Sequence, residues 1–231
     1  MPPTLQREAG TCERILDAAE ALFSARGIDA TSLRAVTRDA KVNLAAVHYH
    51  FGCKKALLDA VVDRRAKPVN DERMVELARL QAAAGPSGAS TEDILRAFLI
   101  PGVRTLEAMG DARQGLSRLV ARIEAQPPQV VEAIWRKHFG EVGRHFLEAL
   151  QKALPHLPEE LVADRFRFTL GTLSYLFSGN FDLDIIPGHP AQSGTDALRV
   201  ARVIDFLVAG LEAEASCPSS SQQPAFPETR A

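Results

Sequence analysis

Apolar residues recur at steps of three and four along most of the chain, and no stretch alternates with the period of two that a half-buried strand requires. The pattern predicts an all-α protein of about nine helices joined by short connections. We expect helices over residues 11–26, 32–40, 44–49, 54–80, 90–106, 116–123, 128–154, 158–179 and 195–214. Pro68 should kink or break the fourth of these, because proline lacks the N–H that a helix interior needs.

Two of the expected helices are unusually short and lie close together, between Thr31 and Lys54. Thr31 and Ser32 stand where a hydroxyl can cap the first helix, and Asn43 stands in the same place before the second. Lys41 and the residue after it break the apolar pattern between them. A short helix, a tight turn and a second short helix form the shape of a DNA-reading helix-turn-helix.

The first three helices should share a small apolar core. Its expected members are Ile15, Leu22, Phe23, Leu33, Val36, Val42, Val47 and Phe51. The second short helix would then turn the opposite side outward. That side carries Asn43, Leu44, Ala45, His48 and Tyr49.

The order and spacing of many residues between Thr11 and Val62 resemble the TetR family of bacterial transcriptional repressors. The matching segments are Ile15 to Glu20, Leu22-Phe23, Arg26-Gly27, Thr31 to Arg34, Val42-Asn43, His48 to Gly52 and Lys54 to Leu58. Two positions depart from the family pattern. Lys41 replaces a turn glycine, which predicts a more strained turn, and Cys53 replaces a serine that would cap the next helix.

The resemblance implies how the head of the molecule contacts DNA. Contacts to phosphate are expected from Ser32, Arg34, Tyr49 and Lys54, and base-edge contacts from Asn43, Leu44, Ala45 and His48. His50 is expected to be structural, with its ring holding the turn. The resemblance also implies a homodimer, paired through helices 158–179 and 195–214, on a pseudo-palindromic operator of double-stranded DNA.

Residues 138–158 and 166–179 resemble the C-terminal domain of fatty-acid-responsive TetR regulators that control β-oxidation genes. This resemblance implies a repressor released from its operator by a small apolar effector, such as a fatty acid or acyl-CoA. Aromatic and sulfur side chains of the body could line the effector pocket. The candidates are Phe98, Met109, Trp135, Phe139, Phe166, Phe168, Tyr175 and Phe177.

The charge distribution is uneven, although the net charge of the whole chain is only −2. Residues 1–67 hold 11 Lys and Arg against 8 Asp and Glu, a balance of +3, so the remainder carries −5. A basic N-terminal unit on an acidic body fits a protein that contacts phosphate at one end. Three widely spaced cysteines predict neither a disulfide framework nor a zinc site, and a bacterial cytoplasm is the expected compartment.

His138, Glu141 and His145 share one helical face, which raises a metal site, but a solvated polar face is the preferred interpretation. The sequence lacks a phosphate-binding glycine loop and a nucleophile elbow, so we expect no enzyme and no cofactor. Two alternatives stay open: a TetR-type regulator of an efflux or stress gene with an aromatic or cationic ligand, and a helical acyl-ligand carrier or small enzyme.

These interpretations divide the chain into four parts. Residues 1–10 should form a flexible arm, and residues 11–55 the DNA-binding domain. Residues 56–214 should form the ligand-binding and dimerisation domain, including the helix that links it to the head. Residues 215–231, rich in Pro and Ser, should be a disordered tail.

Overall fold

The structure, a computed structural model, describes residues 3–85, 88–178 and 196–215, and over these ranges it is all-α as predicted. The elements are α1 Pro3–Arg26, α2 Leu33–Ala40, α3 Leu44–Phe51, α4 Lys54–Ala83, α5 Thr91–Ala108, the short 3-10 helix η2 Gly110–Ala112, α6 Arg113–Glu124, α7 Pro128–Ala153, α8 Glu159–Ser178 and α9 Asp196–Glu212. None of these helices combines the length and apolar character needed to cross a membrane.

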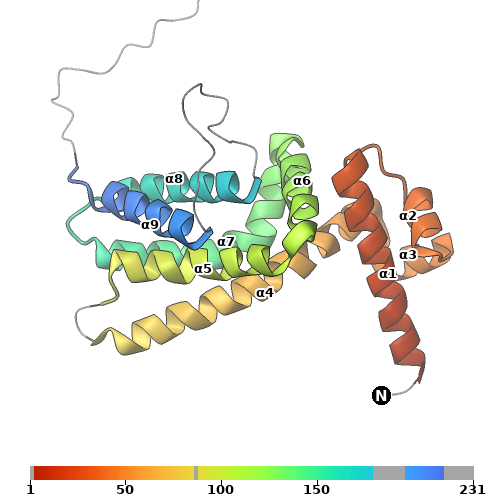
Figure 1. Cartoon of the computed structure of the whole chain (residues 1–231), viewed down its shortest axis with the longest axis horizontal. Helices are drawn as coiled ribbons and strands as arrows, with labels where there is room; N and C mark the ends of the chain where they lie inside the picture. Colours follow the sequence, from red (N-terminus) through yellow and green to blue (C-terminus); the bar gives the residue numbers. More distant parts are fainter. Residues whose placement is uncertain (1–2, 86–87, 179–195, 216–231) are drawn as a thin grey trace, which may run out of the picture.

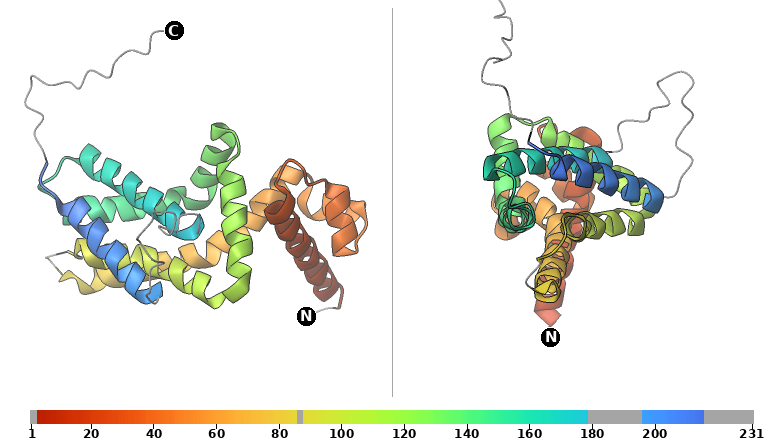
Figure 2. Two further views of the ribbon diagram at one scale, coloured as in Figure 1. Left: turned by 45° about the horizontal axis from the view of Figure 1, so that its top comes forward. Right: turned by 90° about the vertical axis from the view of Figure 1, so that its left-hand side faces the viewer.

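The molecule is elongated, with a small head at one end and a larger helical body at the other (Figure 1). The head consists of α1, α2 and α3, and the body contains α5, α7, α8 and α9. Helix α4 runs from the head into the body, while α6 stands beside α1 at the junction (Figures 1 and 2). A single long helix therefore joins the two ends of the molecule.

Helices α1 and α4 extend further than predicted. Helix α1 begins at Pro3 rather than Thr11, so most of the expected arm is helical; proline is well suited to a first helical turn, where its missing N–H costs nothing. Helix α4 is not broken at Pro68. Leu57 and Val61, before the proline, are buried in the core of the head, and Leu77, after it, is buried in the core of the body, so the helix is held on both sides. The predicted loop 180–194 and the tail from 216 lie outside the described residues.

The predicted core of the head is confirmed, and it extends further than the sequence indicated. Ile15, Phe23, Val36 and Val47 are fully buried, and the remaining predicted members are buried or packed against them. The same cluster continues into α4, α6 and α7. The added members include Leu57, Val61, Leu119, Ile123 and Ile134. The head is thus packed against the body, and a second cluster from α4, α5, α7, α8 and α9 forms the core of the body.

Candidate nucleic-acid interface

Helix α2 is fixed at its start by a side-chain cap and along one face by burial. The Ser32 Oγ accepts a hydrogen bond from the Ala35 N–H at 3.1 Å, from an extended backbone. Val36 and Ala40 are buried against the rest of the head. Arg34 lies on the opposite side and is exposed. The cap uses the acceptor of Ser32 but leaves its O–H free to donate to a phosphate.

The turn between α2 and α3 contains a strained residue, as the sequence predicted. Lys41 has φ 53° and ψ 47°, the left-handed conformation that favours glycine. Among the described residues it is the sole non-glycine with a positive φ. Its N–H donates to the Arg38 carbonyl, and the Val42 N–H donates to the Thr37 carbonyl at 3.0 Å. These two bonds close the end of α2 and set the direction in which α3 departs.

Helix α3 presents most of the predicted face to solvent. The Asn43 Oδ1 caps its start by accepting from the Ala46 N–H at 2.8 Å, and Val47 anchors the inner side. Tyr49 is 77% exposed. Ala45 and His48 are also exposed, while Leu44 is half-buried. A tyrosine this exposed contributes little to the stability of the core, so its side chain is available for contact with a molecule outside the chain.

The turn after α3 is held by His48 and not by His50 as predicted. The His48 Nδ1 lies 2.7 Å from the Gly52 carbonyl oxygen. Because a carbonyl can only accept, Nδ1 carries the hydrogen, and Nε2 of a neutral ring is an acceptor. The His50 ring instead packs edge-on against Tyr49, with centroids 5.1 Å apart. A neutral His48 can therefore read a donor on a base edge.

Lys54 has a structural contact in addition to its predicted contact with phosphate. Its Nζ donates to the Asp29 carbonyl at 3.0 Å, which ties the start of α4 to the connection between α1 and α2. An ammonium group has three N–H donors, so two remain for a phosphate. The contact restrains the Lys54 side chain before DNA binds. A phosphate contact would therefore cost less side-chain conformational entropy.

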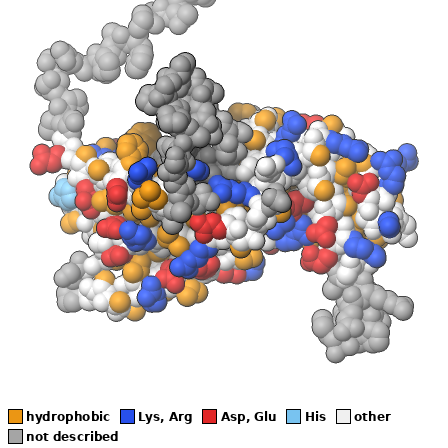
Figure 3. Space-filling model, viewed as in Figure 1, with side chains coloured by type: hydrophobic (Ala, Val, Ile, Leu, Met, Phe, Trp, Pro, Cys, Tyr) orange, Lys and Arg blue, Asp and Glu red, His pale blue; other side chains and the backbone are white. Residues whose placement is uncertain are grey.

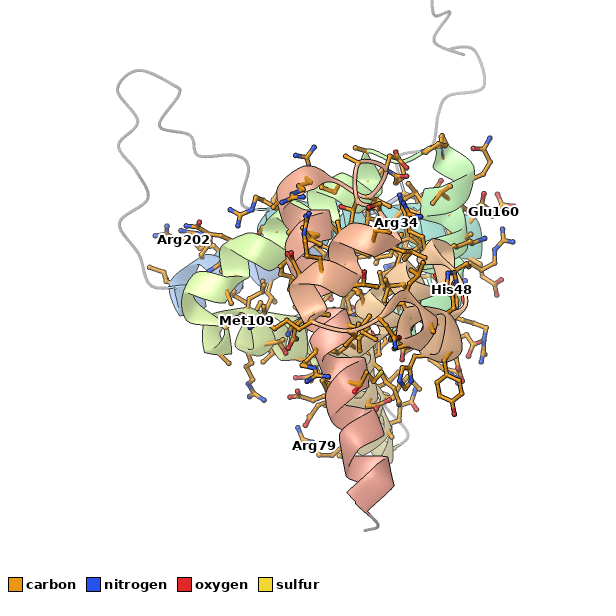
Figure 4. All side chains as sticks on the ribbon, turned by 90° about the vertical axis from the view of Figure 1, so that its right-hand side faces the viewer. Arg34, His48, Arg79, Met109, Glu160 and Arg202 are labelled. Atoms are coloured by element: carbon orange, nitrogen blue, oxygen red, sulfur yellow. The ribbon has the colours of Figure 1, made fainter. Side chains whose placement is uncertain are left out.

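The buried acid of the head, Glu20, is paired away from this surface. Glu20 binds both Arg64 and Arg65 of α4, with the closest contacts at 2.5 and 2.7 Å. In the described ranges, Arg34 and Lys41 form no ion pair, so their charge is available to phosphate. Figure 3 shows blue side chains gathered over the head, and Figure 4 places Arg34 and His48 at the same end of the molecule.

Sequence reasoning did not include two further exposed cations beside this surface, Arg38 and Lys41. Both are exposed near the end of α2, and the Arg38 side chain is 73% exposed, with its nearest acid oxygen on Asp39 at 4.0 Å. The pattern could have identified them, because both fall outside the apolar face of α2.

The predicted effector residues are not gathered in one place. Phe98 and Phe166 are buried in the core of the body, with ring centroids 5.5 Å apart. Trp135 and Phe139 stack on each other at 4.7 Å, and Phe139 packs against the core of the head. Phe168 is 71% exposed. Met109, at the end of α5, is half-buried. The side chains of Tyr175 and Phe177 lie outside the described residues.

His138 is not part of a solvated face, contrary to the prediction. Its side chain is 3% exposed and lies between Asp59 and Asp63 of α4, at 3.7 and 3.5 Å. Glu141 remains exposed, and His145 lies 3.9 Å from Glu148. The three residues therefore diverge, and the described part of the chain contains no group of three side chains suited to a metal ion.

A helix-turn-helix head with an outward second helix, joined to a helical body, defines a DNA-binding regulatory protein. The chain belongs to the TetR family: the model for bacterial regulatory proteins of the tetR family matches residues 15–61, and the model for the tetracyclin repressor-like C-terminal domain matches residues 96–210. It is therefore a TetR-type transcriptional regulator, a class of DNA-binding proteins and not of enzymes.

The head also resembles the HTH-type transcriptional regulator TtgW of Pseudomonas putida. The two are 39% identical over 59 residues, which is 26% of this chain and 44% of that protein. The match thus spans less than half of the relative's length.

Solved structures share the whole fold. A TetR-family regulator from Mesorhizobium loti has a TM-score of 0.58 at 21% identity, covering 89% of this chain and 96% of that one. The fatty acid degradation regulator FadR from Bacillus halodurans has a TM-score of 0.61 at 14% identity, covering 93% and 99%. At these identities the likeness establishes the fold alone.

Proposed function

We propose that the chain is a dimeric TetR-type repressor, released from a pseudo-palindromic operator by a small apolar effector such as a fatty acid or acyl-CoA. The outward face of α3, on which Tyr49 is 77% exposed, carries the DNA-reading part of this proposal. Residues 11–55 act as the DNA-binding domain, and residues 56–214 bind the effector and the second subunit.

Two groups of side chains divide the work at the operator. Phosphate contacts come from the O–H of Ser32 and from Arg34, Tyr49 and Lys54, which fix the register of the head on the duplex. Base contacts come from α3. Its reading residues are Asn43, Leu44, Ala45 and His48. Leu44 and Ala45 are suited to apolar contact with thymine methyl groups. Asn43 and His48 are suited to hydrogen bonds with donors and acceptors on the base edges.

The dimer is supported by apolar side chains that a single copy leaves in solvent. Phe168 and Leu170 on α8 are 71% and 40% exposed, and Phe206 on α9 is 72% exposed. Burying such side chains against a second copy is favourable by about 25 cal/mol per Å². An interface that repeats on both subunits has two-fold symmetry, so the two heads face two half-sites related by the same symmetry.

The apolar effector is supported by the resemblance of residues 138–158 and 166–179 to fatty-acid-responsive regulators, and by the similarity in fold to FadR of Bacillus halodurans. An effector can shift DNA affinity only by the difference between its affinities for the DNA-binding and released states. The release step therefore requires an effector site whose geometry differs between the two states.

Fluorescence anisotropy of the full chain on DNA from its own promoter region tests the proposal. Binding should weaken with salt, and Arg34→Ala should lower the slope of log affinity against log salt by about 1 if Arg34 contacts one phosphate. Arg79→Ala is the matched control, because Arg79 is an exposed arginine on α4 that pairs with Glu76. A fatty acid or acyl-CoA of long chain should release the DNA.

The outcomes separate the parts of the proposal. Specific DNA binding that ignores every lipid would retain the regulator and refute the lipid effector. Equal affinity for promoter DNA and random DNA would refute the DNA-reading role of α3.

A further inference from the structure

A polar layer crosses the interface that α4 forms with α5 and α7. The Asn70 Nδ2 donates to the His138 carbonyl at 2.7 Å, and the Arg73 Nε donates to the Phe98 carbonyl at 2.8 Å. The Arg73 Nη1 donates to the Asn70 Oδ1 at 3.0 Å. Asn70 and Arg73 are 7% and 4% exposed. An arginine this buried is uncommon unless a negative charge accompanies it.

No carboxylate accompanies the Arg73 charge among the described residues. The adjacent acids Asp71 and Glu72 pair with other cations on the outer side of α4. Burial lowers the pKa of the Arg73 guanidinium to about 10, and no neighbouring charge opposes that shift. Beyond the two hydrogen-bonded oxygens of Phe98 and Asn70, which carry no net charge, the guanidinium faces the Phe98 ring, whose centroid lies 4.4 Å from the Arg73 Cζ. A ring face attracts a cation but does not neutralise it.

Arg73 also retains unused hydrogen-bond donors. A guanidinium carries five N–H groups, and the contacts to Phe98 and Asn70 engage two of them. The others meet no acceptor in the part of the chain that the structure describes. A carboxylate accepts two parallel N–H bonds from arginine and brings the missing negative charge.

The surroundings of Arg73 are aromatic. The Phe98 ring packs on Phe146 and Phe166, with centroids 4.9 and 5.5 Å away, so α5, α7 and α8 contribute one ring each. A buried cation beside a cluster of rings is suited to a molecule with one anionic group and an apolar body. A cationic ligand would be repelled by Arg73, which argues against the cationic effector that the sequence left open.

We propose that Arg73 anchors the carboxylate of an otherwise apolar effector, whose body packs against Phe98, Phe146 and Phe166. The proposal rests on the proposed function, because it names the chemical class of the effector that the repressor binds. It also separates a free acid from its thioester: forming the thioester consumes the carboxylate, so an acyl-CoA has no charge at the carbon that would face Arg73.

Isothermal titration calorimetry of the full chain tests the anchor with three probes of one chain length: decanoate, methyl decanoate and decanoyl-CoA. The wild-type protein should bind decanoate about tenfold more tightly than the ester or more, as expected for a charge-assisted pair. Arg73→Met should reduce this ratio of acid affinity to ester affinity to about one. Arg73→Lys should keep an intermediate ratio, because lysine retains the charge but cannot donate the two parallel N–H bonds of a guanidinium.

A purely structural Arg73 would leave the ratio unchanged, because acid and ester share the same apolar body. Arg79→Met is the matched control and should keep the wild-type ratio, since Arg79 lies on the same helix with its side chain 71% exposed (Figure 4). If Arg73→Met does not fold, as judged by circular dichroism, the anchor is tested by the ratio of acid to ester affinity in the wild-type protein and in Arg73→Lys.

The anchor is refuted if wild-type protein binds the ester as tightly as the acid, if it binds none of the probes, or if Arg73→Met keeps the preference. The promoter-binding assay distinguishes this failure from failure of the proposed function. Release of DNA by acid and ester alike would refute the anchor and keep the repressor. An Arg73-dependent preference without any effect on DNA would support the anchor and refute the release step.

Discussion

Helix α4 begins without a side-chain cap, although its backbone is prepared for one. Cys53 is extended, with φ −141° and ψ 168°, and forms no side-chain cap. The cap residues Ser32, Asn43 and Ser90 each accept from the N–H three positions later, at 3.1, 2.8 and 3.1 Å. A thiol is a weak acceptor, so the equivalent N–H, on Ala56, is left without a side-chain partner.

Cys53→Ser should therefore stabilise the protein. The serine Oγ would occupy the position from which the other caps reach their N–H, and a good N-cap is worth about 1 kcal/mol relative to a residue that cannot accept. Cys53 is exposed, so its replacement removes no packing. For a chain of this length, 1 kcal/mol corresponds to a rise of about 2–4 °C in melting temperature.

Thermal unfolding followed by circular dichroism under reducing conditions measures the effect. Cys53→Ala is the matched control, because it removes the thiol without adding an acceptor. The serine variant should melt about 2–4 °C above the alanine variant. If the two variants melt at the same temperature, the missing cap is not what limits the start of α4.

Three further predictions follow from the head and the body. Lys41→Gly should stabilise the chain by about 0.5–1 kcal/mol in urea unfolding, because glycine removes a left-handed strain of about 1–2 kcal/mol at some entropic cost; a loss of stability would contradict this. Glu20→Gln should cost about 1–2 kcal/mol, because Arg65 loses its carboxylate partner while Arg64 keeps Asp17 and Glu13, whereas Asp71→Asn, in an exposed pair, should cost under about 0.5 kcal/mol. Phe206→Glu should shift the protein from dimer to monomer in sedimentation velocity, and an unchanged dimer would exclude this part of α9 from the interface.

The features that sequence reasoning predicted correctly depend on neighbouring residues. Ser32 and Asn43 cap their helices by accepting a hydrogen bond from the N–H three residues later. The cap and the start of the apolar pattern therefore lie within one helical turn. The strained Lys41 followed from the resemblance to the TetR family, in which a glycine stands at this position of the turn. Helix α4 continues through Pro68 because packing against α1, α5 and α7, which local sequence does not reveal, outweighs one missing hydrogen bond.

The features that were missed depend on contacts between distant segments. Arg73 lies three positions after Asn70 and four before Leu77, so helical spacing alone places it on the buried face of α4. Whether a polar residue there is buried depends on what covers it, and the covering carbonyl belongs to Phe98, in another helix. His138 was misjudged for the same reason, because the carboxylates beside it come from α4.

The unbroken α4 connects the proposed effector anchor to the DNA-binding head. Arg73 follows Lys54 by 19 residues on α4, which at 1.5 Å per residue is a lever of about 28 Å. If α4 pivots at Arg73, a tilt of roughly 5° moves the start of the helix by about 2.5 Å, which is close to the length of a hydrogen bond.

Lys54 would carry that movement into the head through its bond to the Asp29 carbonyl. Helix α6 provides a second connection, because the Ser24 hydroxyl of α1 donates to the Gly115 carbonyl at 2.9 Å and the Ser174 hydroxyl of α8 donates to Glu124. An effector that changes the packing of α4 or α8 would therefore act on contacts of the head, which is the coupling that the proposed release of DNA requires.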